Sequence, residues 1–255
     1  MINKSQRWLV LVIVLFALLG LTLSIARQPS HIAVRTNYTV YLPMVSRPLG
    51  MGLAWGSHRT ELNADWCYNA WDAGGCLNSN YDFQHPATPC PTIELLGNEP
   101  DGWEGSGYPT EPEVAAGLSR QAREVCPNTV FIAGNTVQGN TVWIDGYLEA
   151  GGVADWLGTH CYAPTAQDCI VILTTFREHY LTWPICVTEW NIGSEREGTP
   201  LTTRPQEFKS FLDWIKIAFP CSAVYTDYAP PPWDIHNLLN PDGTPNELGR
   251  IFAGR

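Results

Sequence analysis

Residues 92–101 read Thr-Ile-Glu-Leu-Leu-Gly-Asn-Glu-Pro-Asp, a short apolar run that stops at an Asn-Glu pair followed directly by proline. Because a residue that precedes proline favours extended geometry, we expect Glu99 to be the last residue of a buried strand. A carboxylate at the end of a buried parallel strand is where β/α-barrel enzymes hold catalytic groups. The same residues also fit a polar turn shaped by Asn98 and Asp101. The stretch alone therefore leaves two interpretations open, a catalytic carboxylate and a turn before the next helix.

The rest of the chain alternates apolar strands with helices. We predict strands at residues 51–56, 65–72, 129–134, 155–162, 184–190 and 223–228, and helices at 111–125, 142–150, 170–180, 204–219 and from 247. Strands that alternate with helices form a parallel sheet, and the number of units predicts a small TIM-type (β/α)8 barrel. Only twenty residues separate Trp71 from Thr92, although a crossover takes about 10–12 residues by itself. We therefore expect a third strand at 80–84 with little or no helix behind it, so that the third β/α unit is reduced or missing.

The first 26 residues have the pattern of an export signal peptide. Lys4 and Arg7 precede an almost unbroken apolar run that ends in the small-residue sequence Ser24-Ile25-Ala26. The run is also long enough for a retained membrane anchor, and both alternatives place the rest of the chain outside the cytoplasm. Residues 27–48 contain Pro and Ser without periodicity and are expected to form a linker. Residues 49–255 are expected to form a single catalytic domain.

Eight cysteines suit that compartment, because an even number in an exported chain indicates disulfides. No two of them have the Cys-x-x-Cys spacing of zinc or redox sites. The sequence does not determine their connectivity. Cys161–Cys169 and Cys186–Cys221 are the predicted pairs, because each would join neighbouring strand ends or their loops.

The composition argues against several classes of partner and cofactor. The formal net charge is −10 and no Lys/Arg-rich stripe is present, which disfavours nucleic acid or an anionic membrane surface and favours a neutral substrate. A membrane is expected as a partner only through a retained N-terminal anchor. The serine hydrolase motif Gly-x-Ser-x-Gly is absent from the sequence, and the six histidines are scattered. We therefore expect no metal and no cofactor.

A second predicted strand, 184–190, also ends near a glutamate, Glu189. All strands of a parallel barrel finish at the same rim, so Glu99 and Glu189 are expected to converge over one pocket. Hydrolysis of a glycosidic bond uses two carboxyl groups, one that protonates the leaving oxygen and one that attacks the anomeric carbon or activates water. His160 and Tyr162 leave an intervening strand on one face, where they are expected to orient a glutamate or bind the sugar. The alternative for His160 is a structural histidine with its hydrogen bonds satisfied in the core.

Together these motifs resemble the signatures of the retaining clan A glycoside hydrolases. The segments concerned are Leu96-Gly97-Asn98-Glu99-Pro100-Asp101, His160-Cys161-Tyr162, Val187-Thr188-Glu189-Trp190 and, at the second strand, Trp66-Cys67-Tyr68-Asn69-Ala70-Trp71. Over residues 50–230 the chain is most similar to family 128, small secreted β-1,3-glucanase-like enzymes with a glycosyl hydrolase catalytic core. The resemblance implies that Glu99 is the acid/base, that Asn98 contacts the sugar 2-hydroxyl and that Glu189 is the nucleophile. The implied substrate is a β-glucan.

Several tryptophans fall at predicted strand ends or in loops, and about half of them are expected to line a cleft for the sugar. A flat ring with an apolar face suits a pyranose, and the alternative for each ring is packing in the core. Trp190, next to Glu189, is the preferred residue of the cleft. The full set of predicted substrate-binding residues is Asn98, His160, Tyr162, Trp190, Trp55, Tyr68, Asn69, Trp71, Trp103 and Tyr228.

We therefore predict a secreted, monomeric glycoside hydrolase that acts on a polysaccharide or oligosaccharide, with β-1,3-glucan and endo cleavage favoured. Two alternatives stay open. One is a non-catalytic carbohydrate-binding protein on the same barrel, and the other is a clan A glycosidase that cleaves xylan, mannan or β-1,4-glucan. A retaining mechanism requires the two carboxyl groups about 5–5.5 Å apart, against about 6.5–9.5 Å for inversion.

Overall fold

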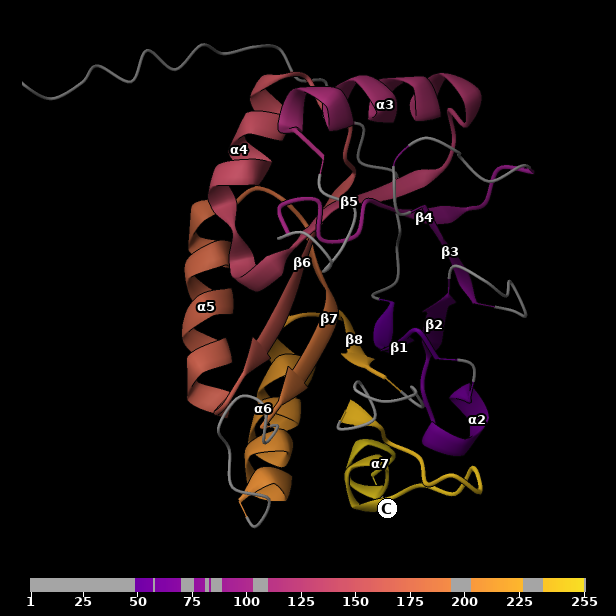
Figure 1. Ribbon diagram of the computed structural model, residues 1–255, viewed down its shortest axis with the longest axis vertical. Coiled ribbons are helices and arrows are strands. Elements are labelled where there is room, and N and C mark those ends of the chain that lie inside the picture. Colours follow the sequence, from indigo (N-terminus) through magenta and orange to yellow (C-terminus); the bar gives the residue numbers. More distant parts are fainter. Residues whose placement is uncertain are drawn as a thin grey trace, which may run out of the picture. The chain divides into compact units, whose positions relative to one another are not determined.

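Within the residues that the structure describes, eight strands form a closed parallel barrel (Figure 1). They are β1 Gly50–Ala54, β2 Trp66–Asn69, β3 Leu77–Asn80, β4 Ile93–Leu96, β5 Val130–Thr136, β6 Trp156–Ala163, β7 Ile185–Ile192 and β8 Cys221–Tyr225. Each strand pairs in parallel with the next, and β8 pairs with β1. The computed structural model describes residues 49–56, 58–69, 76–80, 83, 89–102, 110–193, 203–226 and 236–254. The predicted export signal and linker lie outside these residues.

Helices follow most of the strands, as the alternation in the sequence predicts. They are α2 Arg59–Leu62, α3 Pro112–Val125, α4 Thr141–Glu149, α5 Ala166–His179, α6 Arg204–Ala218 and α7 Glu247–Phe252, with a 3-10 turn, η1, at Val137–Gly139. Helix α3 packs against α4, and α5 packs against α6, on the outside of the sheet (Figure 1). Asn140 caps α4 and Thr165 caps α5, because their side-chain oxygens accept hydrogen bonds from backbone N–H groups of the first turn. The predicted parallel β/α barrel is thus confirmed.

The third strand is present but lies earlier in the chain than predicted. Strand β3 begins at Leu77 rather than at residue 80, and it pairs with both β2 and β4. It follows directly on Cys76, which a disulfide joins to Cys67 of β2. This covalent link returns the chain to the sheet sooner than the spacing alone suggests, so the predicted position was wrong. The chain between β3 and β4 is described only in part, and the predicted loss of the third helix lies outside the described residues.

Two clusters of apolar side chains hold the barrel and the helices together. One cluster contains residues of the strands but none of the helices, among them Trp66, Tyr68 and Ile132, and it fills the barrel interior. The other includes the buried faces of the helices and packs them on the outer face of the sheet. Successive residues of a strand point to opposite faces, so one strand can supply both clusters. Burial of a large apolar side chain contributes about 1.5–3 kcal/mol, which makes these two layers the main source of stability.

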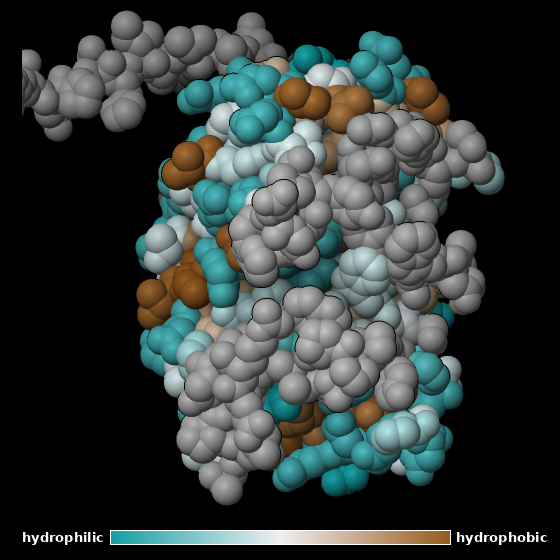
Figure 2. All heavy atoms as spheres, in the orientation of Figure 1, coloured by the Kyte–Doolittle hydropathy of each residue, from teal (hydrophilic) through white to brown (hydrophobic). Residues whose placement is uncertain are grey.

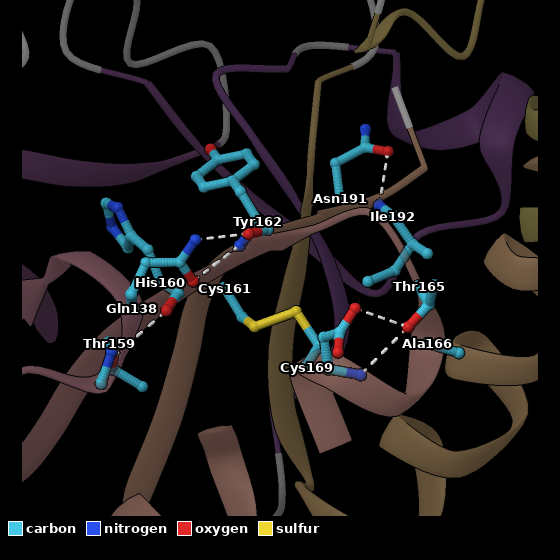
Figure 3. The surroundings of a disulfide bond; sticks show 12 residues. Gln138, Thr159, His160, Cys161, Tyr162, Thr165, Ala166, Cys169, Asn191 and Ile192 are labelled. Carbon is cyan, nitrogen blue, oxygen red and sulfur yellow. Dashed lines mark hydrogen bonds between the residues drawn. A yellow bond between two sulfur atoms is a disulfide. The ribbon is translucent and has the colours of Figure 1, made fainter. Parts of the chain in front are cut away.

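All eight cysteines are paired in disulfides. The pairs are Cys67–Cys76, Cys90–Cys126, Cys161–Cys169 and Cys186–Cys221. The two predicted pairs are therefore confirmed: Cys186–Cys221 joins the neighbouring strands β7 and β8, and Cys161–Cys169 joins β6 to α5 (Figure 3). Disulfides persist in oxidising compartments, so four of them agree with the predicted location outside the cytoplasm.

On the described part of the surface, large hydrophobic side chains are scattered over several helices. They lie on the helices α3, α4, α5 and α6 and in the turn after α5. The residues are Val114, Val125, Val142, Val171, Leu181 and Ile217. Figure 2 shows hydrophobic residues interspersed with hydrophilic ones on the face drawn there. In the described part of the chain, no helix has the length and apolar character needed to cross a bilayer. The polar groups at the rim of the barrel are therefore the stronger candidates for function.

Candidate active site

Three titratable side chains meet at the carboxyl ends of β4, β6 and β7. Glu99 follows β4, His160 lies in β6 and Glu189 lies in β7, and the ends of parallel strands meet at one rim. One carboxylate oxygen of each glutamate and one ring nitrogen of His160 lie within 4.8 Å of one another. His160 Nδ1 is 3.2 Å from Glu99 Oε1 and 3.7 Å from Glu189 Oε2. The structure thus brings together the two glutamates that were expected to converge, with the imidazole in contact with both.

The carboxylate of Glu189 accepts hydrogen bonds from three side chains. Tyr68 donates its hydroxyl to Oε1 at 2.5 Å, and Trp55 donates its indole N–H to the same oxygen at 2.7 Å. Tyr162 donates its hydroxyl to Oε2 at 2.5 Å. Because Glu189 is buried, these charge-assisted bonds act in a region of low dielectric and stabilise negative charge on the carboxylate. Three of the predicted substrate-binding residues therefore lie at the site, where each contacts Glu189.

Glu99 reaches the site from a turn rather than from a strand. Strand β4 ends at Leu96, and Glu99 has a left-handed backbone with φ of 47°. Its N–H donates to the carbonyl of Asn135 in β5 at 3.1 Å, and its own carbonyl accepts from the N–H of Gly102 at 2.8 Å. The prediction that Glu99 ends the strand in extended geometry was wrong, because these bonds outweigh the local preference of a residue before proline. Asn98 is partly buried beside it.

His160 is fully buried, and only one of its ring nitrogens faces the glutamates. Its Nε2 atom has no hydrogen-bond partner among the described residues, so Nδ1 makes all of its polar contacts there. Burial acts to lower the pKa of His160, but the charge of Glu189 and the hydrogen bond with Glu99 outweigh it and raise the pKa above its ordinary value. The predicted alternative of a satisfied structural histidine does not fit this environment, and His160 can hold a proton next to both carboxyl groups.

Tyr162 forms an aromatic cluster with Tyr225 and His236, two residues that the sequence analysis missed. The ring centroids of Tyr162 lie 5.8 Å from those of Tyr225 and of His236, and the latter two are 5.7 Å apart. Asn191 holds the segments that carry them, since its amide donates to the carbonyls of Tyr225 and His236. Burial, together with the nearby charge of Glu189, raises the pKa of both tyrosines, which keeps their hydroxyls protonated and able to donate.

Alternation along the last strand could have indicated Tyr225, because it ends strand β8 Cys221–Tyr225 and faces the same way as Cys221 and Ala223. No local pattern marks His236, because it lies far along the chain in a segment without periodicity. Its place at the site comes from the fold alone.

The strand segment that carries His160 and Tyr162 is held on both sides (Figure 3). The side-chain amide of Gln138 donates to the carbonyl of Tyr162, and its Oε1 accepts from the N–H of Tyr162 at 3.2 Å. The intervening residue, Cys161, is bonded to Cys169 of α5. Neighbouring residues of a strand face opposite ways, so the disulfide lies on the outer face of β6, while His160 and Tyr162 face inward. This arrangement limits the freedom of both side chains.

Trp190, the preferred cleft residue of the sequence analysis, does not line the site. It is fully buried and packs against Phe208 and Phe211 of α6, with ring centroids 5.2 and 5.0 Å away. Glu189 points into the barrel, so the next residue points out toward the helices. A side chain without exposed surface cannot stack on a sugar, and the prediction for Trp190 was wrong.

The remaining predicted contacts are described only in part or not at all. Asn69 ends β2, but its side chain is not among the described groups. Trp71, Trp103 and Tyr228 lie outside the described residues. Their predicted roles stay predictions.

Glu99, His160 and Glu189 also have donor atoms close enough together to be considered as ligands of a metal ion. A histidine that binds a metal usually donates its second ring N–H to an acceptor, but His160 Nε2 has none among the described residues. Both oxygens of Glu189 already accept hydrogen bonds from phenol and indole groups. The donor set therefore suits proton transfer and nucleophilic attack better than it suits metal binding.

Comparisons with known proteins identify the family of the chain and its fold. Residues 51–252 match the protein family described as glycosyl hydrolase catalytic core. Among curated protein sequences, none matches the chain significantly.

Among solved structures, a GH128 endo-β-1,3-glucanase from Amycolatopsis mediterranei in complex with laminaritriose is similar with a TM-score of 0.65 and 14% identity, over 81% of this chain and 99% of that one. A GH128 endo-β-1,3-glucanase from Lentinula edodes has a TM-score of 0.63 and 13% identity, over 80% and 98%. A GH128 exo-β-1,3-glucanase from Aureobasidium namibiae has a TM-score of 0.60 and 15% identity, over 79% and 94%. At this level of identity the likeness establishes a shared fold.

Proposed function

Because the chain belongs to the glycosyl hydrolase catalytic core family and is a glycoside hydrolase, we propose that it cleaves β-1,3-glucan internally and with retention of configuration. The substrate class is supported by the structures that share its fold, two of which are β-1,3-glucanases described as endo-acting. The resemblance of the motifs around Glu99, His160 and Glu189 to family 128 supports the same substrate.

The observation that carries the proposal is the short distance between the two carboxyl groups. Oxygens of Glu99 and Glu189 lie within 4.8 Å of each other. A retaining enzyme places its carboxyl groups about 5–5.5 Å apart, whereas an inverting enzyme leaves about 6.5–9.5 Å for a water molecule between them. The shorter distance supports direct attack by one carboxylate on the anomeric carbon.

The surroundings of the two glutamates support different roles. Glu189 receives three hydrogen bonds that stabilise negative charge, which suits a nucleophile. The side chain of Glu99 is 16% exposed, against 5% for Glu189, and its hydrogen bond within the described residues is to His160. A carboxyl group with access to solvent and a titratable neighbour can exchange its proton during each cycle, which suits an acid/base.

The reaction then proceeds in two displacements. In the first, the carboxylic acid of Glu99 gives its proton to the glycosidic oxygen, the bond from that oxygen to the anomeric carbon breaks, and a carboxylate oxygen of Glu189 bonds to the same carbon. In the second, the carboxylate of Glu99 takes a proton from water, the water oxygen bonds to the anomeric carbon, and Glu189 is released. Two inversions at one carbon give net retention.

We further assign the sugar contacts to residues around this pair. Asn98, next to the acid/base, is assigned the contact with the 2-hydroxyl, because the family resemblance implies it. Trp55 and Tyr225 are partly exposed rings beside Glu189 and offer an apolar face to a pyranose. The four disulfides support action outside the cytoplasm.

The proposal is tested by hydrolysis of laminarin and laminari-oligosaccharides, with xylan, mannan and β-1,4-glucan as comparison substrates. We expect short oligosaccharides of several lengths from laminarin, and a β anomer as the first product seen by NMR. Glu99→Gln and Glu189→Gln should each lower kcat by about 10²–10⁴-fold or more. An α anomer formed first would overturn retention. A wild-type protein that binds laminari-oligosaccharides but never cleaves them would support the carbohydrate-binding alternative.

Azide separates the roles of the two glutamates. In Glu99→Ala, azide should restore turnover of an aryl β-laminaribioside with a good leaving group. The product should be a β-glycosyl azide, because Glu189 still forms the covalent intermediate that azide attacks. In Glu189→Ala, azide replaces the nucleophile itself and should give an α-glycosyl azide. The reverse pattern of products would exchange the two assignments.

A further inference from the structure

Asn135, a buried residue at the end of β5, connects the segments that carry the two glutamates. It is 1% exposed and has a left-handed backbone with φ of 48°. A buried side-chain amide is costly unless its donors and its acceptor are all satisfied. The amide of Asn135 has partners for its donor and for its acceptor, and these partners lie on or next to two other strands, β4 and β7.

On one side, Asn135 holds the turn that leads to Glu99. Its Nδ2 donates to the carbonyls of Leu96 at 3.0 Å and Gly97 at 2.8 Å. A weaker contact of the same group reaches the carbonyl of Ile132 at 3.3 Å. Its main-chain carbonyl accepts from the N–H of Glu99 at 3.1 Å. Both the side chain and the backbone of this one residue therefore set the course of the chain from the end of β4 to Glu99.

On the other side, Asn135 is bonded to the residue before Glu189. The hydroxyl of Thr188 donates to Asn135 Oδ1 at 2.8 Å and lies 3.4 Å from the carbonyl of Thr159. Thr188 is fully buried, so loss of this hydroxyl would leave Oδ1 without its partner. The single amide of Asn135 thus bridges β4 and β7.

Strand β6 lies between these two strands, and a glycine makes room for the bridge. A Cβ atom at Gly158 would lie 1.9 Å from Asn135 Oδ1. The side chain of Asn135 therefore passes over the backbone of β6 at the one residue that has no side chain. The pairing of the strands is irregular close to these residues. Register shifts lie between Ala133 and Thr136 in the β5–β6 pair, between Thr159 and His160 in the β6–β7 pair, and between Val187 and Trp190 in the β7–β8 pair. The backbone ladders are interrupted at this level, and the bridge made by Asn135 adds side-chain hydrogen bonds between the strands there.

We propose that Asn135 is a positioning residue that sets the separation between the carboxyl groups of Glu99 and Glu189. The inference rests on the proposed retaining hydrolysis, which needs that separation within a narrow range. Asn135 touches neither carboxylate and acts through Thr188 and the turn at Gly97.

Thr188 offers the cleanest test. Thr188→Val keeps the shape of the side chain and removes only the hydroxyl, whereas Thr188→Ser keeps the hydroxyl. We expect Thr188→Val to lower kcat by about 10- to 100-fold with KM within about twofold of wild type, because a shift of the reacting groups affects the chemical step. Thr188→Ser should recover most of the loss. Equal kcat in Thr188→Val and wild type would overturn the inference.

Asn135→Asp replaces the amide group that donates to the carbonyls of Leu96 and Gly97 by a carboxylate oxygen, which repels them. We therefore expect a larger loss of kcat than in Thr188→Val. Thr129 provides a matched control, because it is 1% exposed and its hydroxyl donates to the carbonyl of Pro91 at 2.6 Å, at the end of the barrel opposite the glutamates. Thr129→Val should lower the melting temperature and leave kcat unchanged. If it lowers kcat as much as Thr188→Val does at equal stability, the effect on kcat is one of general stability and the positioning role fails.

Crystal structures of wild type and Thr188→Val separate this inference from the proposed function. If the wild type cleaves none of the glycans, the proposed function fails, but the distance between the two carboxyl groups is still measurable. A distance that increases in Thr188→Val supports the positioning role, and a distance that stays the same overturns it.

Discussion

The hydrogen bonds to Glu189 lead to a prediction about two tyrosines. Tyr68→Phe and Tyr162→Phe each remove one hydroxyl and leave the ring in place. Tyr68 is 1% exposed and packs with Trp66 and Trp55, so the phenylalanine fills the same space. Any change in activity then reports on the lost hydrogen bond to the carboxylate.

The magnitude follows from what remains after each change. A hydrogen bond to a charged group contributes about 1.5–3 kcal/mol. In Tyr68→Phe, Trp55 still donates to Oε1, so we expect the low end of this range. In Tyr162→Phe, Glu189 Oε2 loses its hydrogen-bond donor among the described residues, so we expect a cost at the high end of this range. Because about 1.4 kcal/mol corresponds to tenfold, kcat/KM should fall by roughly 10- to 30-fold for Tyr68→Phe and roughly 30- to 150-fold for Tyr162→Phe.

The assay is kcat/KM for a laminari-oligosaccharide of fixed length, measured for each variant and for Tyr147→Phe. Tyr147 is a buried tyrosine of α4 whose hydroxyl donates to the carbonyl of Val153 at 2.6 Å, away from the glutamates. Tyr147→Phe should cost about 1 kcal/mol of stability and leave kcat/KM within twofold of wild type.

The reasoning is refuted if Tyr162→Phe is as active as wild type, or more active. Such a result would mean that the hydroxyl stabilises Glu189 equally in the free enzyme and in the transition state, or more in the free enzyme. A larger loss for Tyr68→Phe than for Tyr162→Phe would contradict the ranking by remaining donors.

Three further predictions concern stability. Folding raises the pKa of His160 above 6.5, so its proton stabilises the folded state fully below that pH, and this contribution is lost as the pH rises through the folded pKa. The melting temperature of wild type should therefore fall more steeply than that of His160→Gln from about pH 6.5 upward; parallel curves would contradict this. Trp190→Ala should lower the free energy of unfolding by about 3–5 kcal/mol in denaturant titrations, because it empties a core position, with KM unchanged. Replacement of Cys90 and Cys126 by alanine should cost about 2–4 kcal/mol, and a cost near zero would mean that their disulfide constrains little.

The two glutamates could be predicted because Glu99 follows a buried strand, Glu189 lies near the end of another, and parallel strands end at one rim. This rule needs only the order of elements along the chain, and it placed Glu99 and Glu189 together, although they are ninety residues apart, without any contact information. The same information was sufficient for the disulfides Cys161–Cys169 and Cys186–Cys221, whose members lie at neighbouring strand ends or in the helix that follows.

Trp190 shows a signal that was present in the sequence but given too little weight. Neighbouring residues of a strand point to opposite faces, so an inward Glu189 already implies an outward Trp190. Proximity along the chain was taken as proximity to the site. The fold separates the two side chains by the thickness of the sheet, with Trp190 against Phe208 and Phe211.

The amino-acid sequence by itself determined the parallel barrel, the strand-end carboxyl groups and the pairing of several cysteines, because these follow from local periodicity and chain order. Only the tertiary structure decided the left-handed backbone of Glu99, the donors around Glu189 and the bridge made by Asn135. The partners of Asn135 are 38 and 53 residues away along the chain, at Gly97 and Thr188. In the sequence, an asparagine next to a glycine is typical of a turn. Local periodicity does not indicate contacts between residues so far apart along the chain. The role of Asn135 appears only when the four strands β4 to β7 are brought side by side.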